Sequence, residues 1–453
     1  MIQERARPEI EEPIGILGYG VEGTSTCRYL LDRGFTDITV FDRKQPSDLD
    51  ARVRYAGTDG SGDYLGGLAD MRTVFRSAGV RPDLPALAEF VRRGGTLTSQ
   101  TGLAFALAGR ERIIGVTGTV GKGTCCSLLH EMLREAEIPA RLGGNIGVPA
   151  LDLASALAPG EKLILELSSF QLSTLAESPA LAAVLRTTTE HLDWHPTRDE
   201  YWLHKANLVR HQAPGDLLAY CADAEGSAWM AGKSPARKTA YGADAEVRID
   251  DKEVRWTRLR FAIPLAATRL KGRFNLENIA AAGILALESG AEPRHVVAAA
   301  MAFKGLEHRL EFVRERNGVA FYNDSYATRP EAAIGAVQAL GGAPLGLILG
   351  GSEKHADFAE LASVIAGSGH VRAIALIGQT ADRLEAELAA AGVKDISGVR
   401  TLRRCADLEE AVAFLLAQVP KGAIALSPAC ASFGLFENYK ERGKAFKKLV
   451  TGL

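Results

Sequence analysis

Short continuous apolar runs, typical of buried strands, alternate along the chain with longer segments whose apolar residues recur at helical spacing. The expected strands are 14–17, 38–41, 73–75, 113–116, 163–167, 182–185, 320–322, 346–349, 373–377 and 423–426. The expected helices are one that ends at residue 31, then 84–92, 125–133, 201–211, 278–289 and 296–303. Because strands that alternate with helices usually pair in parallel, the pattern predicts an α/β protein with mostly parallel sheets.

The order of these elements predicts three domains. The first α/β pattern ends near residues 108–111, and a further one begins near residue 308. The expected domains are therefore 1–109, 110–306 and 307–453. Within them, residues 99–105 are expected to form a loop, and the short alternating runs of 217–268 a small β excursion.

Composition narrows the class of protein. The 453 residues are 47% hydrophobic and 24% charged with a net charge of −2, which is typical of a globular chain and gives no reason to expect nucleic acid or a membrane as partner. The N-terminus is polar, and no apolar stretch approaches the roughly 18 residues of a membrane span. The six cysteines form no CxxC pair. We therefore expect a cytoplasmic protein and, in the absence of any oligomerisation motif, a monomer.

The segment IIGVTGTVGKGTC, residues 113–125, predicts a phosphate-binding loop between a strand and a helix. Its candidate residues are Gly118, Thr119, Gly121, Lys122, Gly123 and Thr124. Glycines allow backbone N–H groups to turn toward a phosphate, and the helix start and the lysine add positive charge. The usual P-loop has a hydroxyl directly after the lysine, where Gly123 stands, so Thr124 is the candidate for Mg²⁺. The alternative is an ordinary glycine-rich turn with a surface lysine.

A second glycine loop, GYGVEG, follows the first expected strand, and Asp42 follows the next strand. This G-x-G-x-x-G spacing predicts a nucleotide or another diphosphate near the first helix, with Asp42 available for a ribose or base. The motif alone does not say which nucleotide. The alternative is that the glycines serve only helix–strand packing.

Polar residues follow several expected strands of the central region. Glu166 ends a strand beside the phosphate loop and offers the hard oxygen ligand that Mg²⁺ prefers. His191 follows the next strand and could face the same site or serve as a structural hydrogen-bonder. Asn145 lies on a glycine-rich turn and could contact a ligand or simply shape the turn. Lys205 lies within a helix, where by pattern alone it would be a solvated charge.

The third region repeats this arrangement. The segments that begin at Asn323, Gly350 and Ser427 each follow an expected strand. Because open α/β sheets bind ligands at the carboxyl ends of their strands, this recurrence favours a binding surface.

Taken together, these motifs resemble the Mur ligase family of ATP-dependent, amide-forming ligases of peptidoglycan precursor synthesis. The likeness runs from residue 14 to the C-terminus. Four segments resemble the branch that adds D-glutamate to UDP-N-acetylmuramoyl-L-alanine: GGNIG (143–147), ELSSFQL (166–172), NDS-x-AT (323–328) and SPACASF (427–433). The resemblance implies a Rossmann-like first domain for the UDP substrate, a central ATPase domain, and a Rossmann-like third domain for glutamate.

The resemblance also implies a role for each matching residue. ATP would be bound by the phosphate loop with Asn278, Arg309 and Asp324, and two Mg²⁺ ions by Thr124, Glu166, His191 and Lys205, the last as a carbamylated lysine. Lys122, Glu166, His191 and Lys205 would be catalytic. The UDP substrate would contact Gly18, Tyr19, Gly20, Asp42, Arg43, Gly79, Asn145 and Ser168. Glutamate would contact Thr328, Lys354, Ser432, Phe433 and Tyr439.

Some positions depart from the family pattern. Val120 and Gly123 alter the phosphate loop, Tyr326 replaces a usual lysine, Arg329 replaces a usual asparagine, and 99–105 lacks a usual acidic residue. Three alternatives therefore stay open: a folylpolyglutamate synthase-like ligase, an NAD-dependent oxidoreductase suggested by GYGVEG with Asp42, and a non-catalytic nucleotide-binding relative.

Overall fold

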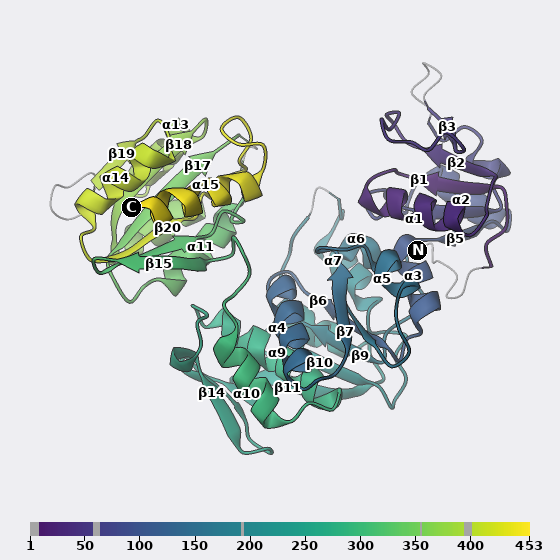
Figure 1. Ribbon diagram of the computed structural model, residues 1–453, viewed down its shortest axis with the longest axis horizontal. Coiled ribbons are helices and arrows are strands. Elements are labelled where there is room, and N and C mark those ends of the chain that lie inside the picture. Colours follow the sequence, from purple (N-terminus) through teal and green to yellow (C-terminus); the bar gives the residue numbers. More distant parts are fainter. Residues whose placement is uncertain (1–8, 58–63, 192–193, 354–355, 394–400) are drawn as a thin grey trace. The chain divides into compact units, whose positions relative to one another are not determined.

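The computed structural model describes residues 9–57, 64–191, 194–353, 356–393 and 401–453. They divide into two compact units, Met1–Ala267 with Leu276–Met301, and Thr268–Asn275 with Ala302–Leu453. Within the described residues the strands form three sheets, two in the first unit and one in the second (Figure 1). The predicted α/β class is confirmed, because most neighbouring strands are parallel.

The first sheet is parallel throughout, with the strand order β3-β2-β1-β4-β5. Its strands are β1 (Ile14–Leu17), β2 (Ile38–Phe41), β3 (Arg54–Ala56), β4 (Thr73–Arg76) and β5 (Thr96–Thr98). The helices α1 (Val21–Asp32) and α2 (Pro85–Arg92) belong to two different apolar clusters around this sheet. Ile14 and Ile16 pack with Leu30 of α1, while Leu17 packs with Leu87 of α2.

The second sheet has the order β14-β13-β12-β11-β10-β9-β6-β8-β7 and is parallel from β7 to β12. Its strands are β6 (Ile113–Thr117), β7 (Ala140–Gly144), β8 (Lys162–Glu166), β9 (Leu181–Val184), β10 (Leu217–Cys221), β11 (Arg237–Gly242), β12 (Val247–Ile249), β13 (Glu253–Trp256) and β14 (Phe261–Pro264). The helices of this region are α3 (Gln100–Ala108), α4 (Lys122–Glu135), α5 (Ala150–Ser155), α6 (Ser169–Leu172), α7 (Arg198–Ala206), α8 (Glu225–Ala231), α9 (Phe274–Glu288) and α10 (Pro293–Ala302).

Three sequence expectations in this region were wrong. Residues 217–268 do not form a separate excursion, because β10 and β11 continue the parallel sheet next to β9. Residues 99–105 belong mostly to α3, whose first turn is capped by the Ser99 hydroxyl accepting from the Gly102 amide at 2.9 Å. The helix expected over 201–211 begins earlier, at Arg198, and ends at Ala206.

The third sheet has the order β15-β16-β20-β17-β18-β19, with only the β15–β16 pair antiparallel among the described strands. Its strands are β15 (Glu311–Arg316), β16 (Val319–Asn323), β17 (Leu345–Gly351), β18 (Val371–Gly378), β19 (Thr401–Arg404) and β20 (Gly422–Leu426). Its helices are α11 (Pro330–Ala339), α12 (Ala359–Gly367), α13 (Ala381–Ala390), α14 (Leu408–Gln418) and α15 (Tyr439–Gly452).

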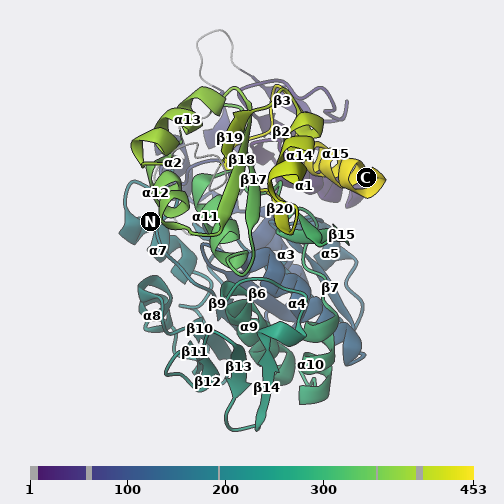
Figure 2. The same cartoon turned by 90° about the vertical axis from the view of Figure 1, so that its left-hand side faces the viewer.

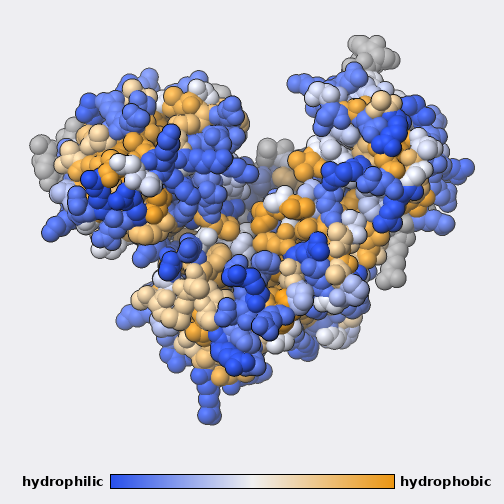
Figure 3. All heavy atoms as spheres, in the orientation of Figure 1, coloured by the Kyte–Doolittle hydropathy of each residue, from blue (hydrophilic) through white to orange (hydrophobic). Residues whose placement is uncertain are grey.

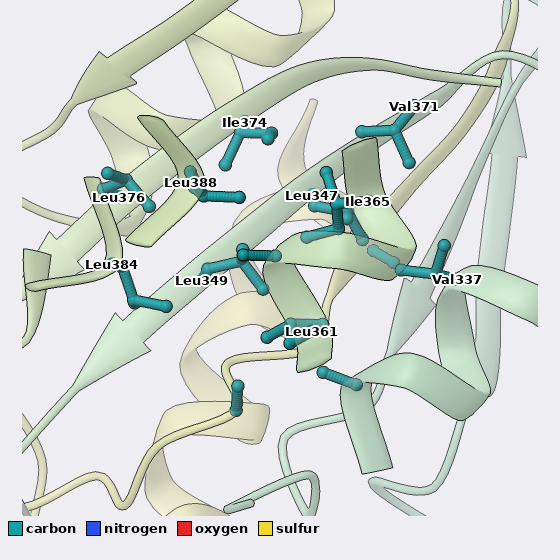
Figure 4. Close-up of a cluster of buried hydrophobic side chains, with 14 of the residues drawn as sticks. Val337, Leu347, Leu349, Leu361, Ile365, Val371, Ile374, Leu376, Leu384 and Leu388 are labelled. Atoms are coloured by element: carbon teal, nitrogen blue, oxygen red, sulfur yellow. The ribbon is translucent and has the colours of Figure 1, made fainter. Parts of the chain in front are cut away.

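Helices cover both faces of this third sheet. The helices α11, α12 and α13 pack on one face, and α14 and α15 on the other (Figure 2). On the first face, Leu347 and Leu349 of β17 point toward Leu361 of α12 and Leu384 of α13 (Figure 4). Removing this apolar surface from water is the main term that holds helices and sheet together.

The parallel strands place several candidate residues at strand ends, as the sequence predicted. Gly18 follows β1, Gly118 follows β6, Glu166 is the last residue of β8, and Asp324 follows β16. On the face shown in Figure 3, hydrophilic and hydrophobic residues are interspersed over both units. Among the described residues, no helix combines the length and apolar character needed to cross a membrane.

Candidate functional site

The phosphate loop connects β6 to α4, as the sequence predicted. Gly121 caps α4 with φ of 87°, and a Cβ there would lie 2.2 Å from Asn278 Oδ1. Only glycine fits, because the backbone is left-handed and the Asn278 amide lies against the loop. Lys122 Nζ donates to the carbonyls of Gly118 at 2.9 Å and Thr119 at 3.0 Å. The lysine is therefore folded onto the loop whose phosphate site it would serve.

Lys205 reaches the same loop from α7. Its Nζ donates to the Gly118 carbonyl at 2.9 Å and lies 4.8 Å from the Tyr201 ring centroid. The side chain is 2% exposed, so the solvated charge expected from the helical pattern alone was wrong. Burial lowers the pKa of Lys205 well below its usual range, and the neighbouring Lys122 lowers it further. A buried lysine with a lowered pKa is an uncharged, nucleophilic amine for more of the time than a surface lysine.

Glu166 lies at the end of β8, next to β6 in the sheet. The residue is 2% exposed, and its Oε1 accepts from Asn145 Nδ2 at 2.8 Å. The other oxygen, Oε2, is buried and has no hydrogen-bond partner among the described residues. A buried carboxylate oxygen without a partner is unfavourable unless a cation occupies its lone pairs. The donor set here therefore suits a hard divalent cation such as Mg²⁺.

His191 and Thr124 are the other candidate metal ligands. His191 has a left-handed backbone with φ of 58°, and its ring lies 4.8 Å from that of Phe170 on the ELSSFQL segment. Its Nε2 lies 3.6 Å from the Glu190 carboxylate. Thr124 is buried in the first turn of α4, two residues after Lys122. An uncommon backbone conformation at a candidate ligand is typical of functional loops.

A cavity of about 370 Å³ opens beside the first glycine loop. It brings together several candidates for the UDP substrate from segments far apart in the sequence. These candidates are Gly20, Gly79, Asn145 and Ser168. Its wall also includes Glu22 and Gln171, which the sequence analysis did not single out. The Glu22 carboxylate accepts from the Ala78 amide at 3.0 Å through Oε2, and from Gln171 Nε2 at 2.8 Å through Oε1. Their only sequence signal was membership of the GYGVEG and ELSSFQL motifs.

The remaining candidates for the UDP substrate follow strands β1 and β2 of the first sheet. Gly18 has φ of 88°, and Tyr19 follows it. The Asp42 carboxylate accepts from the Tyr19 amide at 2.7 Å and so shapes this loop. Arg43 lies with its guanidinium 5.6 Å from the Tyr64 ring.

In the second unit, Asp324 is almost fully buried at the end of β16. Its Oδ2 accepts from Ser427 Oγ at 2.7 Å and its Oδ1 from the Leu310 amide at 2.9 Å. Burial raises the pKa of Asp324 to about 7, against the lowering effect of these hydrogen bonds. Arg309 lies 4.0 Å over the ring of Tyr326, the residue that replaces the usual lysine. Where the family pattern has a lysine and this chain has Tyr326, the guanidinium of Arg309 thus lies beside the ring.

The candidate glutamate residues lie on the loops around β16 and β20. Tyr439 begins α15, and its ring meets that of Tyr326 at 5.0 Å. Ser432 is buried, Phe433 is 55% exposed, and Thr328 follows Tyr326 on the same loop. Lys354 lies outside the described residues.

Arg442, which the sequence did not single out, connects the two loops. Its buried guanidinium donates to the Ser325 carbonyl at 2.8 Å and to the carbonyls of Cys430 and Ala431 at 3.1 and 3.2 Å. A guanidinium on a helix gives no sequence signal that distinguishes it from a solvated charge. Its contacts hold the NDSYAT and SPACASF segments together.

Two family models match this chain. The Mur ligase middle domain matches residues 116–286, and the Mur ligase, glutamate ligase domain matches residues 308–430. A UDP-N-acetylmuramoylalanine–D-glutamate ligase of Symbiobacterium thermophilum is 36% identical over 98% of this chain and 99% of its own. The chain belongs to the Mur ligase family. A ligase of the same name from Acetivibrio thermocellus is 35% identical over 97% of this chain and 96% of its own.

Solved Mur ligases share the fold. The MurF ligase of Thermotoga maritima, determined in complex with ADP, covers 100% of this chain and 96% of its own at 17% identity, with a TM-score of 0.61. The UDP-N-acetylmuramate–alanine ligase MurC of the same organism covers 97% and 99% at 15% identity, with a TM-score of 0.58. At these identities the likeness supports the Mur ligase fold and not the choice of substrate.

Proposed function

We propose that this Mur ligase couples ATP cleavage to the addition of D-glutamate to UDP-N-acetylmuramoyl-L-alanine, in peptidoglycan precursor synthesis. One observation carries the proposal. The phosphate loop with Lys122 lies against the buried Lys205 and in the same sheet as Glu166, in a chain that aligns over almost its whole length with ligases of that name. An NAD-dependent oxidoreductase would leave this loop and the glutamate ligase domain without a role.

We assign ATP to the central phosphate loop. The backbone of Gly118, Thr119, Gly121 and Gly123 would receive the phosphates, with Lys122 leaving its loop carbonyls to neutralise them. Asn278, whose amide already lies against Gly121, and Arg309 and Asp324 of the second unit would complete the ATP contacts.

The residues present also fit Mg²⁺. Glu166 offers an unpaired buried oxygen, and Thr124 a hydroxyl at the start of α4. His191 and Lys205, the latter after reaction with CO₂ to a carbamate, would serve a second ion. When bound, the ions neutralise charge that develops on the transferring phosphoryl group.

The reaction follows from two nucleophilic steps on the substrates. The L-alanine carboxylate attacks the γ-phosphorus of ATP, which breaks the bond to the bridging oxygen and releases ADP. The amine of D-glutamate then attacks the acyl phosphate through a tetrahedral intermediate, loses a proton, and expels inorganic phosphate. Lys122 and Arg309 would stabilise the negative charge, and the buried surroundings would exclude the water that hydrolyses an acyl phosphate.

The UDP moiety and glutamate are assigned to the two outer regions. Gly18, Tyr19, Gly20, Asp42, Arg43 and Gly79 would bind the UDP portion, and Asn145 and Ser168 the acyl portion. Thr328, Lys354, Ser432, Phe433 and Tyr439 would surround glutamate. We accordingly propose functional domains 1–109, 110–306 and 307–453, in a monomeric, cytoplasmic enzyme.

Phosphate release tests the proposal. The protein is assayed with ATP and Mg²⁺, adding UDP-N-acetylmuramoyl-L-alanine and D-glutamate separately and together, with L-glutamate and a pteroate substrate in parallel. Release that needs both the UDP substrate and D-glutamate, and that Lys122→Met abolishes, is expected. Release with the pteroate substrate would instead favour a folylpolyglutamate synthase-like ligase. ATP binding without release for any pair would favour a non-catalytic relative.

A further inference from the structure

Two buried histidines and a glutamate converge next to the catalytic region. His195 Nδ1 lies 3.1 Å from His204 Nδ1, and both side chains are almost completely buried. Glu200 lies one helical turn before His204 on α7, and one of its carboxylate oxygens lies within 4.8 Å of a ring nitrogen of each histidine. Residues four apart share one face of a helix, so α7 presents Glu200 and His204 in the same direction. His195 joins them from the segment before the helix.

The spacing of the two nitrogens suits a tetrahedral metal ion. Zn–N bonds of about 2.0–2.1 Å in tetrahedral geometry place two bound nitrogens roughly 3.3 Å apart. Without an ion, the 3.1 Å separation of His195 and His204 is an N–H···N hydrogen bond. An ion would therefore replace one shared proton, with little movement of either ring. Glu200 is partly exposed, so its side chain can adjust to the ion and leaves a route from solvent.

A neighbouring hydroxyl holds one ring in the orientation that ligation needs. His195 Nε2 lies 2.9 Å from Ser169 Oγ, on the ELSSFQL segment. When Nε2–H donates to Ser169, the lone pair of Nδ1 points toward His204. Metal-bound histidines commonly donate their other ring N–H to such an outer partner.

The surroundings limit which ion would bind. Trp194 and Tyr201 pack against His195 at ring distances of 4.6 and 5.1 Å. Arg81 lies beside Trp194 and is paired with Asp83 at 2.7 Å. The positive charge of Arg81 makes binding of a hard ion such as Mg²⁺, which is held mainly by charge, less favourable. Neutral imidazole donors, which suit Zn²⁺, Cu²⁺ and Ni²⁺, are less affected.

We propose that His195, Glu200 and His204 form a transition-metal site of the Zn²⁺ type, distinct from the Mg²⁺ sites at the phosphate loop. Water would take the fourth position. The site would tie the segment after β9 to α7. His191 lies on that segment, where its carbonyl accepts from the His195 amide at 2.8 Å, and Lys205 follows His204 directly. The ion would thus connect the segment that carries His191 to the helix that carries Lys205.

Cobalt substitution tests the site without any need for activity. The full-length protein, stripped with EDTA and held in excess Mg²⁺ to occupy hard-ion sites, is titrated with Co²⁺, whose visible absorption intensifies in tetrahedral coordination. One equivalent is expected to give this absorption and to quench tryptophan fluorescence, because Trp194 contacts both histidine rings. His204→Gln should weaken Co²⁺ binding by more than about 10-fold, and Ser169→Ala by about 10-fold. Zn²⁺ should compete for the same equivalent.

Matched variants locate the ion. His211→Gln, at a histidine outside the cluster, should leave binding unchanged. His308→Gln tests the other group with ligand spacing in the described residues, Glu307, His308 and Glu311. The proposal is overturned if the wild-type protein gives no tetrahedral absorption, if His308→Gln rather than His204→Gln removes it, or if a thiolate charge-transfer band places the ion on a cysteine. The absence of tetrahedral absorption in the wild-type protein would by itself overturn the proposal. The test therefore does not depend on whether a variant folds.

Discussion

The buried carboxyl of Asp324 makes the stability of the second unit depend on pH in an unusual direction. Burial raises the pKa of Asp324 from its ordinary 3.8 to about 7, so the folded state keeps the proton over a pH range in which the unfolded state has lost it. A group whose folded pKa is raised contributes stability that is present at low pH and is lost as the pH rises through the folded pKa. At about 1.36 kcal/mol for each pH unit, the full loss is at most about 4 kcal/mol. About 2.5 kcal/mol of it falls between roughly pH 5 and 8.

The substitution Asp324→Asn should remove this dependence. Its Oδ1 can still accept from the Leu310 amide, and its amide nitrogen can donate to Ser427 Oγ where the carboxylate accepted. The variant should therefore gain stability over the wild-type chain as the pH rises from 5 to 8. The gain should approach about 2.5 kcal/mol although the variant would lose ligase activity.

Hydrogen exchange read by mass spectrometry measures this effect in the right part of the chain. Peptides that cover β16 and β20 report the opening of the second unit, and wild type and variant are compared at the same pH so that intrinsic exchange rates cancel. Asp382→Asn, at an exposed aspartate of the same unit, serves as control and should show no such trend. A difference between wild type and Asp324→Asn that stays constant from pH 5 to 8 would show that Asp324 is ionised throughout and would refute the reasoning.

Three further predictions concern the central site. Glu166→Gln should lower ATP-dependent phosphate release by at least about 100-fold with little change in thermal stability, because an amide cannot provide the charge that an ion requires. Labelled bicarbonate should produce a carbamate ¹³C resonance in the wild-type protein, and Lys205→Met should lack it, since the buried Lys205 has a lowered pKa. Gly121→Ala should weaken ATP binding, and it should destabilise the protein by more than the roughly 1–2 kcal/mol that a left-handed backbone costs an alanine, because the new Cβ would overlap the Asn278 amide. Gly147 is also left-handed but has open space around it. Gly147→Ala should therefore show only the backbone effect when both variants are compared in a thermal-shift assay.

The sequence predicted the positions of strands that are short, apolar and followed by glycine or polar loops. It did not predict β3 or β19, because edge strands such as TLRR at Thr401–Arg404 carry exposed polar residues instead of an apolar run. It also missed α3, which is buried nearly all round and so lacks the polar face that reveals a helix. The spacing of apolar residues reveals a helix or strand only when one face is buried and the other is exposed. These elements are exposed or buried on both faces.

In the candidate site too, the sequence indicated some residues and missed others. Motif spacing indicated Lys122 and Glu166, because their chemistry depends on neighbours in sequence. The burial of Lys205 depends on how α7 packs against the phosphate loop. The convergence of His195 and His204 depends on how the segment before α7 folds back onto that helix. No sequence motif indicated either arrangement. The resemblance to a family supplied a role for Lys205 that its helical pattern argued against.

The two lysines at the phosphate loop affect each other's charge state. Lys122 and Lys205 both donate to the Gly118 carbonyl, so two full positive charges at one acceptor would repel. Burial and this repulsion act in the same direction on Lys205, and they favour its neutral amine, the form that reacts with CO₂. The resulting carbamate would replace repulsion of Lys122 by attraction and add a second anionic oxygen donor to that of Glu166. A buried lysine beside a phosphate-binding lysine is therefore unfavourable as a cation, but it is a consistent starting point for a metal-binding carbamate.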